Sequence, residues 1–214
     1  MIRKIKQTLS EKLLLLFVIL LTLSSSVSYF LIKNKCLFIK QYDPEKIIFK
    51  NKKNIAVLNV PCGNVIIELY PEISPNSVKR FKFLIKKGKY DNVAFHRVIK
   101  NTLVQAGDLE FGRRNNLNYS FIGTGKSGYG TINSELDNLF DFKAGSVALA
   151  RTNQKNTEDS QFFILLVDAP LYEGEYSPVG KVIYGLDVLR KIKFDEKVEY
   201  VLRPDFINTF ELLK

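Results

Sequence analysis

Hydrophobic residues form one long uninterrupted run near the N-terminus and many short runs after it. Residues 13–32, LLLLFVILLTLSSSVSYFLI, hold no charge over 20 positions, which as a helix is just long enough to cross a hydrocarbon core of ~30 Å. The most apolar part, 13–23, also has the length of a signal-peptide core; it follows the basic segment 1–12 and precedes small residues at 26–28. We therefore predict a transmembrane anchor or a signal-peptide core at 13–32, with cleavage after Ser28 left open and a buried core helix as the third interpretation.

The next segment, 33–53, is rich in Lys and Asn and has one proline, Pro44. This composition is typical of a linker, and we expect it to let a folded domain at 54–214 stand off the membrane. Basic residues flank the hydrophobic run on both sides, so the distribution of charge does not decide its orientation. We expect a single-pass membrane protein or a protein of the secretory pathway, with the organelle undetermined.

After residue 53 the hydrophobic runs are short and separated by turn residues. Residues 54–60 and 65–70 alternate or run apolar on either side of the turn Pro-Cys-Gly-Asn at 61–64, which predicts a β-hairpin. Further short β-rich runs follow at 93–99, 103–106, 146–151, 161–167 and 179–183. Many short strands with few helices favour a mainly β fold, a closed antiparallel barrel, over alternating βαβ units.

One helix is well marked inside this domain. Ser74 can cap it, Pro75 suits the first helical position, where its missing N–H costs nothing, and Gly88 ends it. The apolar residues that recur between these points at helical spacing are Val78, Phe81, Leu84 and Ile85. A second, shorter helix is predicted from residue 185, and we expect the two helices to cover the ends of the barrel.

Composition narrows the classes of function. The chain is 46% hydrophobic, which is enough for a core, and its formal net charge is +10. A basic surface is weakly attracted to phospholipid headgroups and nucleic acids. The basic residues are dispersed, however, and the sequence holds neither glycine-bracketed aromatics nor Cys/His zinc spacing, so we expect no nucleic-acid binding.

The sequence also offers little for metal, cofactor or hydrolytic chemistry. Its two cysteines, Cys36 and Cys62, imply no disulfide framework, although a single bridge stays open. One histidine, His96, without a cluster of Cys, His or paired carboxylates at ligand spacing argues against a metal site. A nucleophile-elbow motif Gly-x-Ser-x-Gly is missing from the sequence. We therefore expect no metal, no cofactor and no serine-hydrolase triad.

Five short motifs occur in a fixed order along the domain. They are Phe-His-Arg-Val-Ile at 95–99, Gln-Ala-Gly-Asp at 105–108, Gly-Thr-Gly-Lys-Ser at 123–127, Ala-Leu-Ala-Arg-Thr at 148–152 and Ser-Gln-Phe-Phe-Ile at 160–164. In order and spacing they resemble the cyclophilin family of peptidyl-prolyl cis-trans isomerases, with the fourth similar to the Met-Ala-Arg-Thr version of bacterial-type members. The resemblance implies an eight-stranded barrel capped by two helices that binds proline-containing peptides of client proteins in an outer groove.

Isomerisation of an X-Pro bond makes and breaks no covalent bond. Rotation is slow because the nitrogen lone pair is delocalised into the carbonyl, and a catalyst can act by donating a hydrogen bond to that lone pair once the amide is twisted. A guanidinium suits this role, since it stays protonated and holds its donors in fixed geometry. Because no proton is transferred, we interpret His96 as a packed side chain rather than a base.

The resemblance assigns a role to each residue of the motifs. Arg97 is the donor to the prolyl nitrogen, and Gln105 holds the substrate backbone or orients Arg97. Phe163 forms the apolar floor under the proline ring, and Gln161 lines the groove. On one side Ala150 and Arg151 present backbone to the peptide.

The proline pocket departs from the family's usual pattern. Thr102 and Leu103 stand where the family usually has Phe and Met on the pocket wall, and the loss of an aromatic ring can remove on the order of 1–3 kcal/mol of apolar contact. Leu171 replaces the Trp of most cyclosporin-sensitive members, which predicts weak cyclosporin binding. Tyr172 and Tyr176 stand where Leu and His are common. We therefore expect an isomerase that assists folding at or across a membrane with altered activity, or else a module that binds a proline-containing partner without turnover.

Overall fold

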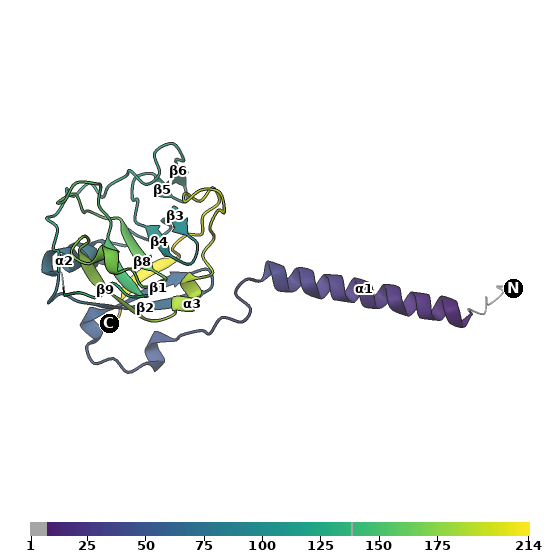
Figure 1. The fold of residues 1–214 in the computed structure, drawn as a ribbon. Coiled ribbons are helices and arrows are strands. Elements are labelled where there is room, and N and C mark those ends of the chain that lie inside the picture. The colour runs from purple at the N-terminus through teal and green to yellow at the C-terminus, as the bar shows by residue number, and fades with distance from the viewer. Residues whose placement is uncertain (1–7, 138) are drawn as a thin grey trace. The chain divides into compact units, whose positions relative to one another are not determined.

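The structure is a computed structural model that describes residues 8–137 and 139–214, so most of the basic segment 1–12 lies outside the described residues. The chain divides into two compact units, one that ends at Phe38 and one that comprises Ile39–Lys214 (Figure 1). Within its described residues the first unit contains one helix. The second holds all the strands.

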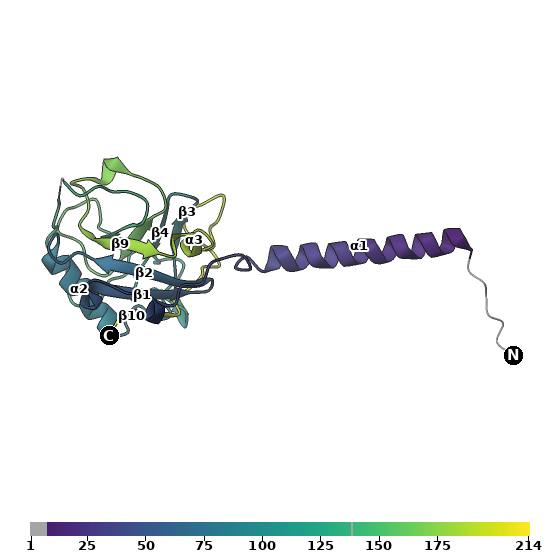
Figure 2. The ribbon, with the colours of Figure 1, turned by 90° about the horizontal axis from the view of Figure 1, so that it is seen from below.

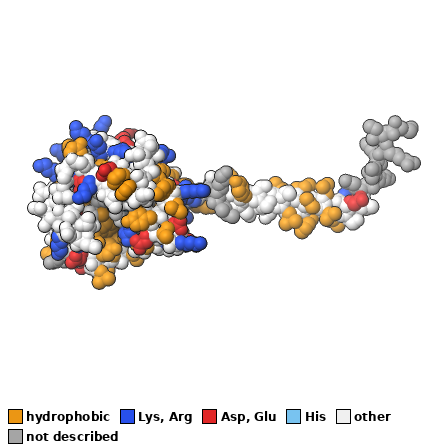
Figure 3. Space-filling view, turned by 90° about the horizontal axis from the view of Figure 1, so that it is seen from above, with side chains coloured by type: hydrophobic (Ala, Val, Ile, Leu, Met, Phe, Trp, Pro, Cys, Tyr) orange, Lys and Arg blue, Asp and Glu red, His pale blue; other side chains and the backbone are white. Residues whose placement is uncertain are grey.

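Helix α1, Leu9–Lys33, is the apolar segment of the first unit. Thr8 and Glu11 form a capping box at its start, in which the N–H of Glu11 donates to the Thr8 hydroxyl and the N–H of Thr8 donates to the Glu11 carboxylate. The most apolar 18-residue window within Leu9–Leu31 has a mean hydropathy of 2.2, and hydrophobic side chains stand exposed along this helix (Figure 3). By length and composition α1 can cross a membrane, and a signal sequence has the same properties.

An eight-stranded antiparallel sheet forms the second unit, in the order β10-β1-β2-β9-β7-β8-β4-β3. Figure 2 shows β9, β2, β1 and β10 following one another in it. The strands are β1 Ile55–Val60, β2 Gly63–Leu69, β3 Arg97–Ile99, β4 Leu103–Ala106, β7 Ser146–Leu149, β8 Phe162–Leu165, β9 Pro178–Tyr184 and β10 Thr209–Leu212, while β5 Gly112–Arg113 and β6 Asn116–Leu117 form a separate ribbon. The mainly β class expected from the sequence is confirmed.

The sheet curls and is closed by a segment that we call the closing seam, residues 199–207. Isolated bridges join Arg97 to Tyr200 and Ala94 to Phe206, so the seam lies along β3 and the residues before it. Five seam residues between the two bridges face only two residues on the other side, and Pro204 among them has no N–H to donate, so no continuous ladder forms there. The barrel is therefore less completely closed than the sequence predicts: the sheet has seven strand pairings, and isolated bridges to the seam take the place of an eighth.

Helix α2, Pro75–Lys86, begins and packs where the sequence predicts, but its N-terminus is capped differently. Ser74 occupies the N-cap position, and the carboxylate of Glu135 accepts from the N–H groups of Asn76, at 3.0 Å, and Ser77, at 2.7 Å. Burial alone would raise the pKa of Glu135, yet these hydrogen bonds hold that pKa below its ordinary value. The cap thus comes from a loop 59 positions away along the chain.

The hydrophobic core lies inside the curled sheet, against α2. The ring of Phe81 lies 5.1 Å from that of Phe162 and 5.5 Å from those of Tyr90 and Phe210, measured between centroids. All four side chains are fully buried. Helix α3, Leu186–Leu189, has only four residues and is shorter than the sequence suggests.

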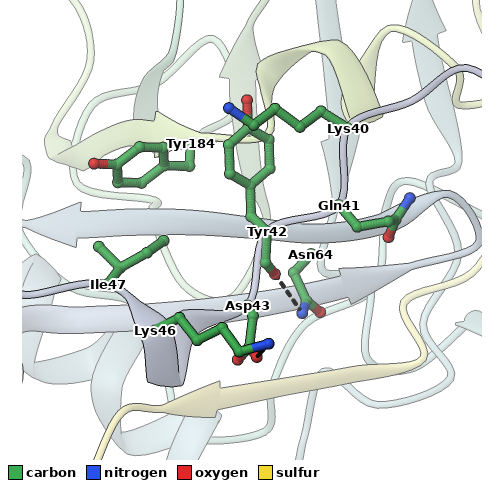
Figure 4. A pocket seen from close by; sticks show the side chains of 8 residues that line it. All are labelled: Lys40, Gln41, Tyr42, Asp43, Lys46, Ile47, Asn64 and Tyr184. Atoms are coloured by element: carbon green, nitrogen blue, oxygen red, sulfur yellow. Dashed lines mark hydrogen bonds and ion pairs between the residues drawn. The ribbon is translucent and has the colours of Figure 1, made fainter.

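The second unit also includes the segment that follows Ile39, because this segment packs on the sheet. Figure 4 shows the rings of Tyr42 and Tyr184 side by side, with centroids 5.3 Å apart, and the Asn64 amide donating to the Tyr42 carbonyl at 3.0 Å. These residues border an open hollow of about 630 Å³. The contacts join positions far apart along the chain, so the local Lys- and Asn-rich composition does not reveal them.

Candidate active site

Three neighbouring strands place the main site residues in one row. Arg97 of β3 pairs with Gln105 of β4, and Gln105 pairs with Phe163 of β8. Residues directly opposite each other in a sheet share a face, so these three side chains lie on the same side. Phe162, the neighbour of Phe163, points to the other side and belongs to the core described above.

A cavity of about 500 Å³ lies over this row. Nine of the eleven residues predicted for the site line it: Arg97, Leu103, Gln105, Ala150, Arg151, Gln161, Phe163, Tyr172 and Tyr176. Residues Gly123–Lys126, from the glycine-rich motif, complete one side. The structure therefore brings together residues that span 80 positions from Arg97 to Tyr176.

The apolar end of the cavity is a floor with two aromatic walls. Phe163 is the floor, only 3% exposed, and it packs on Leu103 and other buried apolar residues beneath. The rings of Tyr172 and Tyr176 stand nearly perpendicular to it, with centroids 5.6 Å and 5.0 Å away. Burial of apolar surface stabilises a ligand by roughly 25 cal/mol per Å². This hollow can therefore hold a small apolar ring.

Two of the predicted wall residues lie outside the cavity. Thr102 sits in the turn between β3 and β4, where its hydroxyl donates to the carbonyl of Lys100 at 3.3 Å. Leu171 lies in the 3-10 turn Pro170–Tyr172 and is 89% exposed. The alignment of motifs by spacing places both at the wall, but their side chains do not reach it, and the rings of Tyr172 and Tyr176 form that part of the wall.

A chain of hydrogen bonds runs along the polar side of the cavity. Nη1 of Arg97 donates to Oε1 of Gln105 at 3.2 Å, and Nε2 of Gln105 donates to Oε1 of Gln161 at 3.0 Å. Nε2 of Gln161 then donates to the carbonyls of Gly123 and Gly125, at 2.9 Å and 3.0 Å. The side chain of Gln105 thus contacts both Arg97 and Gln161.

Asp108, which the sequence analysis included in a motif without a role, holds the loop at the end of this chain. Its carboxylate is buried and accepts from the N–H groups of Gly123, at 2.7 Å, and Gly125, at 3.1 Å. A Cβ atom on Gly125 would collide with Oδ1 of Asp108, so only glycine fits there. The motif Gln-Ala-Gly-Asp therefore supplies both Gln105 and the anchor of the glycine-rich loop.

Ala150 and Arg151 form the opposite rim. The N–H of Ala150 donates to the carbonyl of Gln161 at 2.8 Å. The guanidinium of Arg151 lies 5.0 Å from the ring centre of Tyr176 and pairs with the carboxylate of Glu175 at 2.8 Å. The Arg151 side chain therefore supports the aromatic wall, while Arg97 is the arginine beside the polar chain.

The closing seam contributes two residues that the sequence analysis missed. Nε and Nη2 of Arg97 both lie close to Oε2 of Glu199, at 2.7 Å and 2.6 Å. Tyr200 lines the cavity and stacks on the buried ring of His96, with centroids 6.3 Å apart. Both residues lie about a hundred positions from Arg97 in the chain, and no local pattern in the seam marks them.

Within residues 8–137 and 139–214, no group of three or more His, Cys, Asp or Glu residues is arranged to hold a metal ion. Beside the apolar hollow the chemistry available is that of the Arg97 guanidinium and the amides of Gln105 and Gln161, and the side chains of Lys126, Arg151, Asn153 and Asp159 also line the cavity. This combination can bind an uncharged ring and donate hydrogen bonds beside it, and neither task needs a proton to change its position.

Comparisons with protein families and with individual proteins point to the same group of enzymes. A sequence model of the family "Cyclophilin type peptidyl-prolyl cis-trans isomerase/CLD" matches residues 55–210. A probable peptidyl-prolyl cis-trans isomerase of Brucella suis is 38% identical over 161 residues, which cover 72% of this chain and 80% of the relative. A peptidyl-prolyl cis-trans isomerase of Schizosaccharomyces pombe is 34% identical over 140 residues, or 63% of this chain and 82% of the relative.

Solved structures of the same group of proteins are similar to this chain. A Cryptosporidium parvum cyclophilin-type isomerase, crystallised in the presence of the dipeptide Ala-Pro, has a TM-score of 0.65 and 25% identity, with 75% of this chain and 99% of that chain covered. A cyclophilin from Hirschia baltica has a TM-score of 0.64 and 22% identity, with 80% of each chain covered, and that similarity speaks for the fold alone.

His96 gives the site a testable pH dependence. Burial is the main cause that lowers the pKa of His96, from 6.5 to about 4. In the unfolded chain the imidazole takes up a proton near pH 6.5, whereas the folded chain resists protonation until about pH 4. The free energy of unfolding should therefore fall as the pH drops through this window, by about 3 kcal/mol in total at roughly 1.4 kcal/mol per pH unit.

We expect the imidazole protons of this one histidine to titrate near pH 4 in an NMR experiment on the folded chain. The variant His96→Gln, which cannot titrate, should lose less stability than the wild type between pH 6.5 and pH 4.5 in urea denaturation. A titration midpoint above pH 6 would contradict the buried, neutral state of the ring.

Proposed function

The chain belongs to the cyclophilin-type peptidyl-prolyl cis-trans isomerase family, and on that premise we propose that it isomerises X-Pro bonds of protein clients at the cavity of Arg97 and Phe163. One observation carries the proposal: the guanidinium of Arg97 lines the same cavity as the apolar hollow whose floor is Phe163. The hollow fits a pyrrolidine ring, and the guanidinium is the donor that a twisted amide needs.

The role of Arg97 in the reaction follows from the change in electron density at the prolyl nitrogen when the amide twists. Rotation about a peptide bond has a barrier of about 18–20 kcal/mol, because the nitrogen lone pair is shared with the carbonyl. In the twisted state the lone pair is localised on the prolyl nitrogen, and an N–H of Arg97 donates to it. This hydrogen bond is strongest in the twisted state, so it lowers the barrier more than it tightens binding of the planar peptide.

The walls determine which clients fit. Phe163, Tyr172 and Tyr176 hold the proline ring, while Thr102 contributes nothing to the wall. Two tyrosine rings in place of the family's usual wall residues give the hollow an altered outline, and we expect altered preferences for the residue before proline. Gln105 and Gln161 hold Arg97 and the loop at Gly123, so the donor stays in place whichever client is bound.

Isomerisation of an X-Pro peptide by the chain, measured by NMR exchange spectroscopy, tests this proposal. The variant Arg97→Ala should lose about a hundredfold or more in kcat/KM, the usual effect of removing one preorganised donor. Its affinity for the peptide should stay within about threefold, because the hollow is unchanged. Arg203→Ala, which removes an exposed arginine outside the cavity, should match the wild type.

Two outcomes would contradict the proposal. If the wild type does not accelerate exchange but still binds the peptide, the chain is a binding module rather than a catalyst. If Arg97→Ala weakens binding as much as turnover, Arg97 does not act mainly on the twisted state.

We also propose that the isomerase acts at a membrane, with α1 as its anchor. The support is the length and exposed apolar surface of α1. Cys36 and Cys62 are both disulfide-bonded, a state that persists in oxidising compartments such as the bacterial periplasm or the secretory lumen. The clients would then be secreted or membrane proteins that fold in that compartment.

Membrane fractionation of cells that express the full chain tests the anchor. The chain should stay in the pellet after carbonate extraction, and its N-terminus should precede residue 13. The variant Leu16→Arg/Leu20→Arg should be released, since each arginine costs about 3 kcal/mol at the centre of a membrane helix. A mature N-terminus after Ser28, or release of the wild type, would contradict an uncleaved anchor.

Cyclosporin should bind this protein weakly. Leu171 replaces the Trp of sensitive family members and lies outside the cavity, at the surface. We expect only weak binding of the drug to the wild type in isothermal titration calorimetry, because residue 171 offers no aromatic ring to the cavity. Nanomolar affinity of the wild type would contradict this expectation.

A further inference from the structure

The carboxylate of Glu199 contacts the side of the Arg97 guanidinium that does not face Gln105. Oε2 of Glu199 lies 2.7 Å from Nε and 2.6 Å from Nη2, while Nη1 donates to Gln105. A guanidinium has five N–H groups, and these contacts engage three of them. One N–H on Nη1 and one on Nη2 are left for the substrate.

From this geometry we infer that Glu199 is a positioning residue for isomerisation, which holds the Arg97 guanidinium in the orientation that presents these two N–H groups. The inference rests on the proposed function, because it assigns Glu199 a role through Arg97. Glu199 acts without touching the substrate, since the cavity is lined by Arg97 and Tyr200 but not by Glu199.

The backbone fixes Glu199 independently of its side chain. Its carbonyl accepts from the N–H of Val98 at 2.9 Å, and two residues further on the N–H of Val201 donates to the carbonyl of His96, also at 2.9 Å. Between them Tyr200 forms the bridge to Arg97. The seam is thus attached to the backbone on both sides of Arg97, and Glu199 is placed to hold the side chain of the same residue.

Two effects of the carboxylate oppose each other. It restricts the rotamers of a long side chain, which keeps the donors in place, and it partly neutralises the charge that stabilises the prolyl lone pair. The Arg97 side chain is 27% exposed and that of Glu199 54%, so solvent screens the charge effect. Orientation should therefore outweigh neutralisation, and loss of Glu199 should slow the reaction instead of accelerating it.

The test compares Glu199→Ala and Glu199→Gln with the control Glu196→Ala in the full chain. Glu196 lies three positions earlier in the same loop and pairs with Lys100 instead of Arg97. We expect Glu199→Ala to lower kcat by about tenfold or more, the scale of a small misplacement, with KM within about threefold. Glu199→Gln keeps an oxygen acceptor and should recover most of the rate, and Glu196→Ala should match the wild type.

A double-mutant cycle shows whether Glu199 acts through Arg97. Adding Glu199→Ala to Arg97→Ala should cause no further loss, because the side chain that Glu199 positions is already gone. An equal loss in both backgrounds would overturn the inference, and so would a Glu199→Ala rate at or above that of the wild type, or a Glu199→Gln rate as low as that of Glu199→Ala.

The Nε–H signal of Arg97 in a ¹⁵N NMR spectrum provides a readout that needs no turnover. It should exchange slowly with water in the wild type and in Glu196→Ala, and rapidly in Glu199→Ala. If the wild type shows no isomerase activity, the proposed function fails while this signal still decides whether Glu199 holds Arg97. Equal exchange in all three proteins would overturn the positioning role.

Discussion

The antiparallel register of β3, β4 and β8 determines the positions of Arg97, Gln105 and Phe163 relative to one another. Arg97 lies opposite Gln105, and Gln105 lies opposite Phe163, so a guanidinium, an amide and an aromatic ring stand in one row on one face. A shift by a single residue in either pairing would turn one member of the row into the core. Because Phe162, on the other face, packs with Phe81 and Phe210 inside the sheet, the burial of that ring keeps the register fixed.

Two segments far away in the chain stabilise the row. At one end, the buried carboxylate of Asp108 accepts hydrogen bonds from the N–H groups of Gly123 and Gly125. The carbonyls of the same two glycines accept from the Gln161 amide. At the other end, the closing seam brings Glu199 against Arg97. The barrel closes through isolated bridges at the position where the guanidinium needs support, so closure of the fold and orientation of the donor depend on the same segment.

Short motifs and residue spacing in the sequence indicate only some parts of the fold and the site. Arg97 and Gln105 belong to one hairpin, and the resemblance of its motifs to the family assigned both to the site, while apolar spacing marked the buried face of α2. Contacts between distant segments were not predictable: Glu135 caps α2 from 59 positions away, and Glu199 reaches Arg97 from 102. Spacing alone also misplaced Thr102 and Leu171, because it gives a position in the chain but not the direction of a side chain in a turn.

The central claim is that one guanidinium lies beside an apolar hollow that seats a proline ring. A crystal structure of the chain with a bound X-Pro peptide tests it most directly. We expect the pyrrolidine ring against Phe163, between Tyr172 and Tyr176, with Nη1 or Nη2 of Arg97 within hydrogen-bonding distance of the prolyl residue. A peptide bound elsewhere, or an Arg97 side chain turned away from the proline, would contradict it.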